Sequence, residues 1–255
     1  MQVPTISVPT ISLPPFQMPA IQGTLRRRIL ANYLVEPQVM QRYLPPPFQL
    51  KLHQGFAVAG LCLIRLEHVR PRGIPEFIGL SSENAAHRVA VTFQENGVQK
   101  EGVFIWRRDT NSQVHEWLGG HLFPGDYQHA TFEVQDQDPS IALNILSQDQ
   151  QVKIFLKGQV QTHLPETSVF ADLQTSSAFF EAGSVGYSPD RQGQKLDAME
   201  LKTRGWEVHP LGIEHIRSSF FDNQDLFPAG SIRFDHALIM RDLEHEWHGA
   251  GELRV

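Results

Sequence analysis

A predicted β-hairpin in the first half of the chain constrains the fold more than any other feature. Residues 86–94 and 100–108 both have the composition of strands, and Glu95-Asn96-Gly97 lies between them. Asn-Gly supplies the two positive φ values that a tight hairpin turn needs. The sequence therefore predicts an antiparallel pair of strands at this place.

Strand-like runs recur along the rest of the chain, separated by short polar or turn-forming gaps. The further strands are expected at residues 24–33, 55–68, 128–134, 141–147, 151–164, 199–208 and 231–247. Short helical or irregular segments are expected after Glu36-Pro37, over 112–117, over 168–182 and over 218–226. Many short strands with few helical periods predict a mainly β fold, arranged as an antiparallel barrel or sandwich.

The first 23 residues differ from the rest because they are proline-rich and carry no charged side chain. The pentapeptide Val-Pro-Thr-Ile-Ser occurs there twice in tandem, at 3–7 and 8–12. Proline fixes φ and removes a backbone donor, which excludes a helix or a central strand. We therefore expect an extended arm over 1–23, either loose or packed on its own or a neighbouring subunit, and a single domain over 24–255.

Composition excludes several classes of function. The net charge is −6 and the pI is about 6.0, and the one basic run, Arg26 to Arg28, lies inside a predicted strand, so no nucleic-acid partner is expected. No stretch approaches the ~20 apolar residues that span a membrane. Cys62 is the only cysteine and lies in an apolar run, which indicates a small buried side chain and a cytoplasmic protein without disulfides. Phosphate-loop, dinucleotide and nucleophile-elbow motifs are missing, so no cofactor is expected.

Residues 117–132 (WLGGHLFPGDYQHATF) contain an aromatic-proline pair within a glycine-containing segment. Together with Arg26, Tyr33, Pro45 and Glu83, in that order and spacing, this segment resembles the acetoacetate decarboxylase-like superfamily. The resemblance implies an antiparallel β-barrel or double sheet with a few short helices around a central, mostly apolar cavity. It also implies a homo-oligomer, for which the arm over 1–23 is a candidate contact.

Three further patterns place the resemblance within an uncharacterised branch of that superfamily. They are an Asn-x-x-x-Arg-Val strand beginning at Asn84, a Gly-Val-Phe-Ile-Trp strand over 102–106, and the Phe-Pro-Gly-x-Tyr turn over 123–127. In the decarboxylases, two lysines follow the aromatic-proline pair, and one of them forms a Schiff base with the substrate. Gly125 and Asp126 stand at those positions here. Neither can supply an amine, so decarboxylation is not expected.

The resemblance also assigns roles to other residues. The arginine that holds the substrate carboxylate falls on Arg26 and the assisting glutamate on Glu83, with Gly125 and Tyr127 at the ligand-binding turn. Arg26 and Glu83 form either a ligand-gripping site or a structural pair. Strand lysines that could replace the missing amine are most often solvated; they are Lys100, Lys153 and Lys157.

Histidine is abundant near the same turn. His121, with Asp126 and Glu83, is a candidate acid–base group, whereas Asp126 is also a good turn residue. The turn, with His115 and His129, lacks the spacing of a common metal motif. In the C-terminal run 244–248, alternating polar residues are interpreted as the solvent side of a strand, so no metal is expected.

Three functions remain open from the sequence. The first is binding of a small apolar, carbonyl-bearing or carboxylate-bearing ligand in the central cavity, oriented by Arg26. The second is a lyase or isomerase that uses Glu83, Asp126 or His121 as acid and base. The third is a structural or oligomerisation protein with a filled core. The first is preferred, and whether the protein is an enzyme stays open.

Overall fold

The structure, a computed structural model, describes residues 20–112, 127–190 and 195–254. Its strands are β1 (Ile21–Val35), β2 (Gln49–Leu50), β3 (Leu52–His53), β4 (Phe56–Pro71), β5 (Leu80–Glu95), β6 (Val98–Thr110), β7 (Tyr127–Gln137), β8 (Ser140–Ser147), β9 (Lys153–Val160), β10 (Val185–Pro189), β11 (Lys195–Thr203), β12 (His209–Ser218) and β13 (Ile232–Arg254). The helical elements are α1 (Pro37–Met40), α3 (Leu173–Glu181) and the 3₁₀ turns η1 (Gln41–Tyr43) and η2 (Glu76–Ile78).

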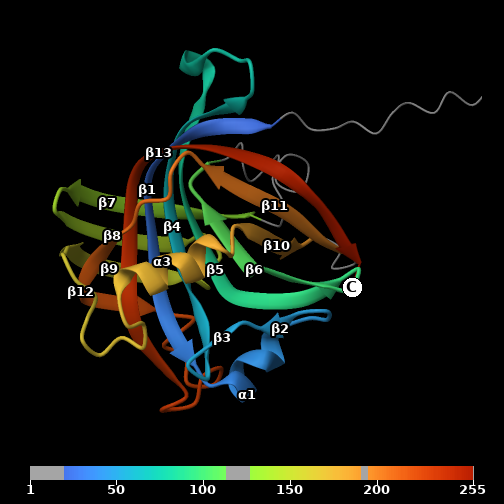
Figure 1. Ribbon diagram of the computed structural model, residues 1–255. Helices are drawn as coiled ribbons and strands as arrows, with labels where there is room; N and C mark the ends of the chain where they lie inside the picture. Colours follow the sequence, from blue (N-terminus) through green and yellow to red (C-terminus); the bar gives the residue numbers. More distant parts are fainter. Residues whose placement is uncertain (1–19, 113–126, 191–194, 255) are drawn as a thin grey trace, which may run out of the picture.

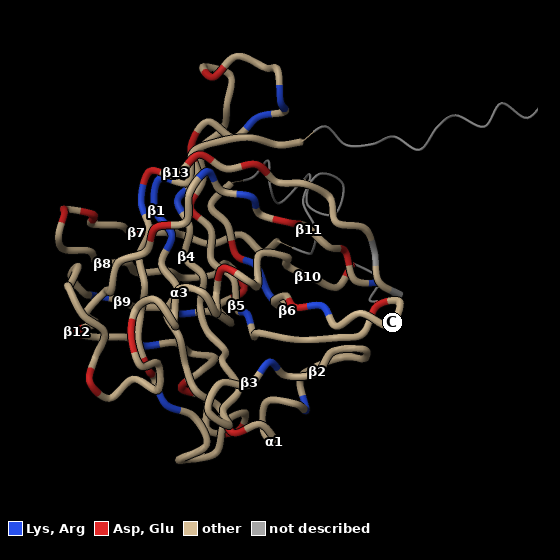
Figure 2. Tube along the Cα trace, in the orientation of Figure 1, with Lys and Arg blue, Asp and Glu red and all other residues tan. Residues whose placement is uncertain are grey.

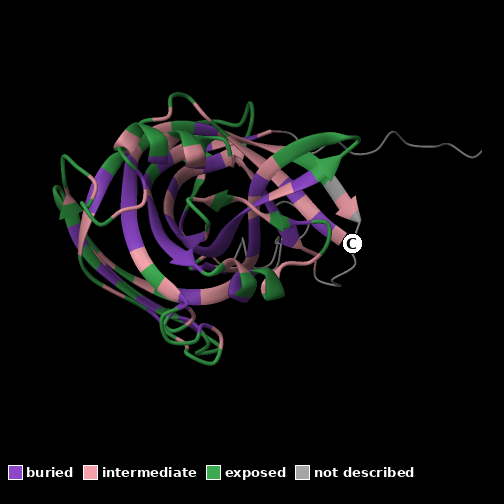
Figure 3. Ribbon diagram, turned by 60° about the horizontal axis from the view of Figure 1, so that its bottom comes forward, coloured by how far each residue is buried: buried purple, intermediate pink, exposed green. Residues whose placement is uncertain are grey.

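The strands form one sheet that closes on itself in two rings (Figures 1 and 3). The larger ring runs β6-β7-β8-β9-β12-β13-β1-β4-β5 and returns to β6. The smaller ring runs β13-β11-β10-β6-β5-β4-β1 and returns to β13. The prediction of a mainly β fold is confirmed. The sheet is mixed rather than wholly antiparallel, because β6 pairs in parallel with both β7 and β10.

Five strands, β13, β1, β4, β5 and β6, belong to both rings and present one face to each. On β1, Ile29 and Ala31 pack into the core that fills the larger ring. Their neighbours Leu30 and Leu34 pack on the opposite side, in a separate cluster that includes Phe180 of α3. Because side chains alternate along a strand, a one-residue shift moves every following side chain to the other compartment.

Such a shift occurs in β1. Its pairing with β4 is irregular between Leu25 and Arg27, so Arg26 lies in a bulge and points to solvent, while Arg27 is buried. Figure 2 shows that positions of both charge signs are interspersed along the trace. The prediction that the arginine run lies inside a strand is confirmed.

Helix α3 closes one side of the shared strands. Its N-cap is Asp172, whose side chain accepts a hydrogen bond from the backbone N–H of Thr175 at 2.7 Å. Ser176 and Phe180 are its buried residues. The helix therefore lies with one face against the even-numbered side chains of β1.

Several boundaries differ from those predicted. β1 begins at Ile21, and β12 was not predicted, because His209-Pro210-Leu211-Gly212 interrupts the alternation that signals a strand. β10 was also missed, since it has only five residues and includes a glycine and a proline. The segment expected as one strand over 199–208 is strand only to Thr203.

None of the helices in the described part of the chain is long and apolar enough to cross a lipid bilayer.

Candidate functional site

Three arginines from three neighbouring strands lie on the face that the shared strands turn toward the smaller ring. Arg28 is on β1, Arg88 on β5 and Arg108 on β6. They occupy three consecutive rows of the sheet, which are Arg28–Ile64–Asn84, Leu30–Cys62–Ala86–Arg108 and Asn32–Gly60–Arg88. Rows on one face are about 7 Å apart. We call this surface, with Cys62 and Asn84 between the arginines, the arginine face.

Small residues line the middle of the arginine face. Cys62 and Ala86 stand between the guanidinium groups, and Gly60 has no side chain. A Cβ on Gly60 would lie 2.2 Å from the carbonyl oxygen of Ala31, so the close approach of β4 to β1 requires glycine there. The three arginine side chains therefore lie beside small residues.

The guanidinium of Arg28 contacts a thiol and an aromatic ring. Its Nε donates to Sγ of Cys62 at 3.3 Å, and its guanidinium lies over the ring of Trp206 at 5.6 Å. The indole is fixed in turn, because Trp206 Nε1 donates to Ser177 Oγ at 2.9 Å. Among the residues that the structure describes, no carboxylate pairs with Arg28. Cys62 is buried, as the sequence predicted, and serves as an acceptor.

Arg88 is almost fully buried and only partly satisfied. Its Nη2 donates to Oδ1 of Asn32 at 2.6 Å, and its guanidinium lies 5.0 Å from the ring centre of Phe180. Nε and Nη1 have no acceptor within the described residues. Burial lowers the pKa of Arg88 to about 10, with nearby Arg28 adding to the effect and Cys62 opposing it. The group is still cationic at neutral pH, so its free N–H groups favour an anion.

A chain of buried hydrogen bonds orients Arg88. Asn32 Nδ2 lies 3.2 Å from His236 Nε2, and Ser176 Oγ lies 2.8 Å from the same nitrogen. His236 Nδ1 lies 2.7 Å from Oδ2 of Asp235. Burial opposes ionisation of Asp235, but hydrogen bonds from His236 and neighbouring groups outweigh it and lower the pKa of that carboxyl. The arrangement has the order of a Ser-His-Asp triad, yet all three side chains are buried, and we interpret it as positioning for Arg88.

Arg108 completes the arginine face from β6. Its Nε donates to Ser188 Oγ on β10 at 3.2 Å, and its guanidinium lies 5.6 Å from the ring centre of Tyr127. No carboxylate within the described ranges pairs with it either. Asn84 adds an acceptor beside the arginines. Its Oδ1 is buried and has no donor within the described ranges, while its Nδ2 donates to Ser82 Oγ at 2.9 Å.

Two arginines on the opposite face, of which Arg27 is buried, are paired with acids. Arg27 donates to Glu83 at 2.5 Å and to Asp136 at 3.1 Å, and Arg241 holds both oxygens of Asp136. Burial raises the pKa of Glu83, against the lowering effect of Arg27. Burial also opposes ionisation of Asp136, but the hydrogen bonds from Arg241 and Arg27 lower the pKa of that carboxyl. This cluster faces the larger ring, and the Nε atoms of Arg27 and Arg241 have no acceptor among the described residues.

The structure therefore corrects the predicted partner of Glu83. Arg26 is exposed and pairs with Asp242 at the surface, because the bulge in β1 turns it outward, and Arg27 takes the place beside Glu83. Tyr127 begins β7 and lies under Arg108, so it does border the arginine face. The other three predicted site residues, Gly125, Asp126 and His121, lie outside the described residues. Arg28, Arg88 and Arg108 are not among the site residues predicted from the sequence, although Arg88 belongs to the Asn-x-x-x-Arg-Val pattern that begins at Asn84.

All six lysines are among the described residues, and none belongs to the arginine face. Four of them are exposed, namely Lys100, Lys153, Lys157 and Lys202. The other two are paired with carboxylates, Lys51 with Glu101 at 2.6 Å and Lys195 with Asp197 at 3.4 Å. The expectation that strand lysines are solvated is confirmed for the three named from the sequence.

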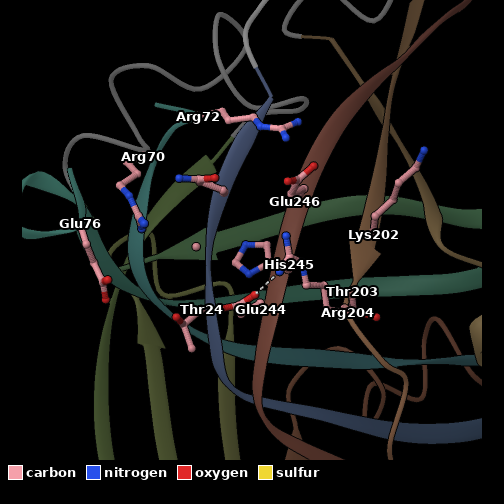
Figure 4. A pocket seen from close by; sticks show the side chains of 12 residues that line it. Thr24, Arg70, Arg72, Glu76, Lys202, Thr203, Arg204, Glu244, His245 and Glu246 are labelled. Atoms are coloured by element: carbon pink, nitrogen blue, oxygen red, sulfur yellow. Dashed lines mark ion pairs between the residues drawn. The ribbon is translucent and has the colours of Figure 1, made fainter. Parts of the chain in front are cut away.

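A separate polar groove of about 540 Å³ opens where β1, β4, β11 and β13 run side by side (Figure 4). The ring of His245 lies at its centre, and burial lowers the pKa of that imidazole to about 4, with Arg28 adding to the effect. Charges of both signs line the groove and include exposed pairs such as Arg204–Glu244 at 3.1 Å. Exposed pairs of this kind are weak. The groove is therefore a poorer candidate than the arginine face.

The described residues contain no group of three or more His, Cys, Asp or Glu side chains that could hold a metal ion. In the C-terminal run, Glu246 pairs with His248 at 3.0 Å, whereas His245 lies on the other face of β13 beside Trp247. Because side chains alternate along β13, Glu246 and His248 lie on one face of the strand and His245 lies on the other.

The fold is that of acetoacetate decarboxylase. The chain is similar to an acetoacetate decarboxylase from Legionella pneumophila subsp. pneumophila str. Philadelphia 1, with 14% identity over 98% of this chain and 93% of that chain and a TM-score of 0.60. An acetoacetate decarboxylase-like enzyme from Sphingomonas wittichii RW1 matches with 12% identity over 98% and 100% of the two chains and a TM-score of 0.57. The enduracididine biosynthesis enzyme MppR, complexed with pyruvate, matches with 13% identity over 94% and 90% and a TM-score of 0.54.

The chain belongs to the DUF2071 family, described as "Uncharacterized conserved protein (COG2071)", whose model matches residues 22–237. No curated protein sequence matches the chain. The predicted resemblance, an acetoacetate decarboxylase-like fold in an uncharacterised branch, is confirmed by these findings.

Proposed function

We propose that the chain binds a small carboxylate non-covalently at the arginine face. The observation that carries the proposal is the buried guanidinium of Arg88, whose Nε and Nη1 point to no acceptor among the described residues. A buried charge without a partner is costly, and a carboxylate matches the fork of a guanidinium with two parallel hydrogen bonds. Arg28 and Arg108 add two further cations on the same face, and neither pairs with a carboxylate of the described residues.

The groups beside the arginines limit the chemical class of the ligand. Asn84 Oδ1 is a buried acceptor that has no donor among the described residues, so it favours a ligand with an O–H or N–H donor near the carboxylate. Phe180 and Trp206 cover two of the guanidinium groups with aromatic rings. A short acid with a hydroxyl substituent fits these features. Pyruvate, with which MppR is complexed, is a suitable probe of the carboxylate contact alone.

Acid–base chemistry by Glu83 receives no support from the geometry. Glu83 pairs with Arg27 and faces the larger ring, while the arginine face belongs to the smaller one. Schiff-base chemistry requires a lysine, and none of the six lysines lies on the arginine face. The proposal is accordingly for a binding protein.

Native mass spectrometry of freshly purified protein tests the proposal. We expect a bound small acid in the wild-type protein and in Arg26→Gln, whose side chain is exposed and outside the site. The double variant Arg28→Gln/Arg108→Gln should carry none. Retention of the same mass by the double variant would contradict the proposal.

Borohydride treatment in the presence of pyruvate provides the complementary test. No increase in protein mass is expected, because the reduction traps only an imine formed with a lysine. A trapped adduct would restore Schiff-base chemistry and overturn non-covalent binding.

A further inference from the structure

A second pocket, of about 400 Å³, lies on the other face of β5 from Arg88. It is lined by His87, Trp106, Arg107, Gln128, Gln151, Val152, Ser219, Phe220, Asn223 and Leu226. His87 and Arg88 are adjacent, so their side chains point to opposite sides of the strand. The pocket is therefore separate from the arginine face, and its size suits a molecule of one or two rings.

Two polar side chains in this pocket lack hydrogen-bond partners. His87 is 1% exposed, and neither of its ring nitrogens has a partner within the described residues. Trp106 Nε1 is also buried without an acceptor there. Buried polar groups are nearly always satisfied, and an unsatisfied one calls for a water or a ligand. The pair offers two N–H donors and one nitrogen acceptor.

The pocket carries no unpaired charge among its described lining residues. Burial lowers the pKa of His87 to about 3, with Arg107 adding to the effect, so the imidazole is neutral. Arg107 is engaged by Asp109 at 2.8 Å and by Asp149 at 3.0 Å. An ion entering the pocket would lose its hydration without gaining a counter-charge, which favours an uncharged ligand.

Aromatic rings shape the same pocket. The ring of Phe220 lies 5.3 Å from that of His87 and 5.2 Å from that of Trp106, measured between ring centres. These side chains form walls against which a flat molecule packs well. Polar side chains, including Ser219 and Asn223, stand on the other sides.

We propose that this pocket binds a planar, uncharged molecule with a carbonyl-type acceptor and an adjacent N–H donor, such as an aromatic carboxamide. Trp106 Nε1–H and one N–H of His87 donate to the acceptor, or to acceptors on the same molecule, and the second nitrogen of His87 accepts. The site is independent of the carboxylate site on the arginine face.

The probe for this site is nicotinamide, and nicotinate is its charged counterpart of the same shape. The readout is the indole N–H signal of Trp106 in a ¹H–¹⁵N spectrum, identified by its loss in Trp106→Phe. Nicotinamide should shift this signal in a saturable way, and nicotinate should bind at least about tenfold more weakly, because a charged ligand gains no partner there. No shift with nicotinamide, or equal binding of nicotinate, would overturn the proposal.

Variants locate the binding. His87→Leu should weaken nicotinamide binding about tenfold or more through loss of its hydrogen bonds. Gln151→Trp, at an exposed position on the rim, should block entry without disturbing the core. His53→Leu is the control, since this imidazole stacks on Phe170 outside the pocket. Unchanged binding in both His87→Leu and Gln151→Trp would show that the probe sits elsewhere and would refute the site.

Discussion

Replacing Arg27 by methionine tests the account of the buried ion cluster. The side chain of Arg27 is 2% exposed, and its partner Glu83 is 9% exposed. Methionine preserves most of the volume and removes the charge, so Glu83 is left in the core without its cation. Asp136 is less affected, because Arg241 still holds both of its oxygens.

The magnitude follows from the burial of the pair. Removing one partner of a buried ion pair costs about 3–5 kcal/mol, since the other charge stays buried without compensation. The matched control is Arg26→Met, one residue earlier, where both partners of the pair with Asp242 are 57% exposed. An exposed pair of this kind contributes no more than about 1 kcal/mol. The two variants should therefore differ by at least about 2 kcal/mol.

Urea unfolding at neutral pH measures the difference. With a slope of about 1–3 kcal/mol per molar urea, Arg27→Met should lower the midpoint by more than about 1 M, and Arg26→Met by much less. The loss in Arg27→Met should shrink at acidic pH. Burial raises the folded-state pKa of Glu83, so its penalty is absent below the unfolded pKa and grows as the pH rises toward the folded value. Equal midpoints for the two variants would refute the assignment of Arg27 as the buried residue.

Further predictions concern stability and pH. Gly60→Ala should lower the free energy of unfolding by about 1–3 kcal/mol or more, because its Cβ would meet the carbonyl of Ala31, whereas Gly249→Ala, which faces open space, should be nearly neutral in thermal or urea unfolding. The double variant Arg27→Met/Glu83→Leu should recover at least about half of the loss of Arg27→Met, since no charge is left unpaired; a further loss in a urea titration would contradict this. His87 has a pKa of about 3 when folded and an ordinary value near 6.5 when unfolded, so the unfolded chain binds a proton first as the pH falls. Between pH 7.5 and pH 5, the free energy of unfolding should therefore fall by about 2 kcal/mol less in His87→Leu than in the wild type. An identical dependence on pH for the two proteins in urea titrations would count against a neutral, buried His87.

The sequence predicted the class of fold because its signals were local. The Asn-Gly hairpin, the long apolar strand over 55–68 and the turn-separated short runs correspond to β5–β6, β4 and the strands of the larger ring. β10 and β12 were missed because glycine and proline break their alternation. The closure into two rings depends on pairings between distant strands, such as β11 with β13, and no local pattern carries that information.

The candidate site was predicted only in outline. An arginine next to Glu83 was expected, but the bulge after Leu25 decides which arginine, and a bulge leaves no clear mark in a run of three identical residues. Arg28 and Arg88 were within the patterns noticed in the sequence. Only the arrangement of the strands side by side shows that neither arginine pairs with an acid among the described residues.

The most direct test of the carboxylate site is a ¹H–¹⁵N spectrum of the arginine side chains during titration with pyruvate. The account predicts that the Nε–H signals of Arg28, Arg88 and Arg108 shift in a saturable way, while that of exposed Arg26 does not. Pyruvamide, which lacks the negative charge, should leave all four signals in place. Shifts of the Arg26 signal alone, equal shifts with pyruvamide, or no shift of the three face arginines would contradict the central claim.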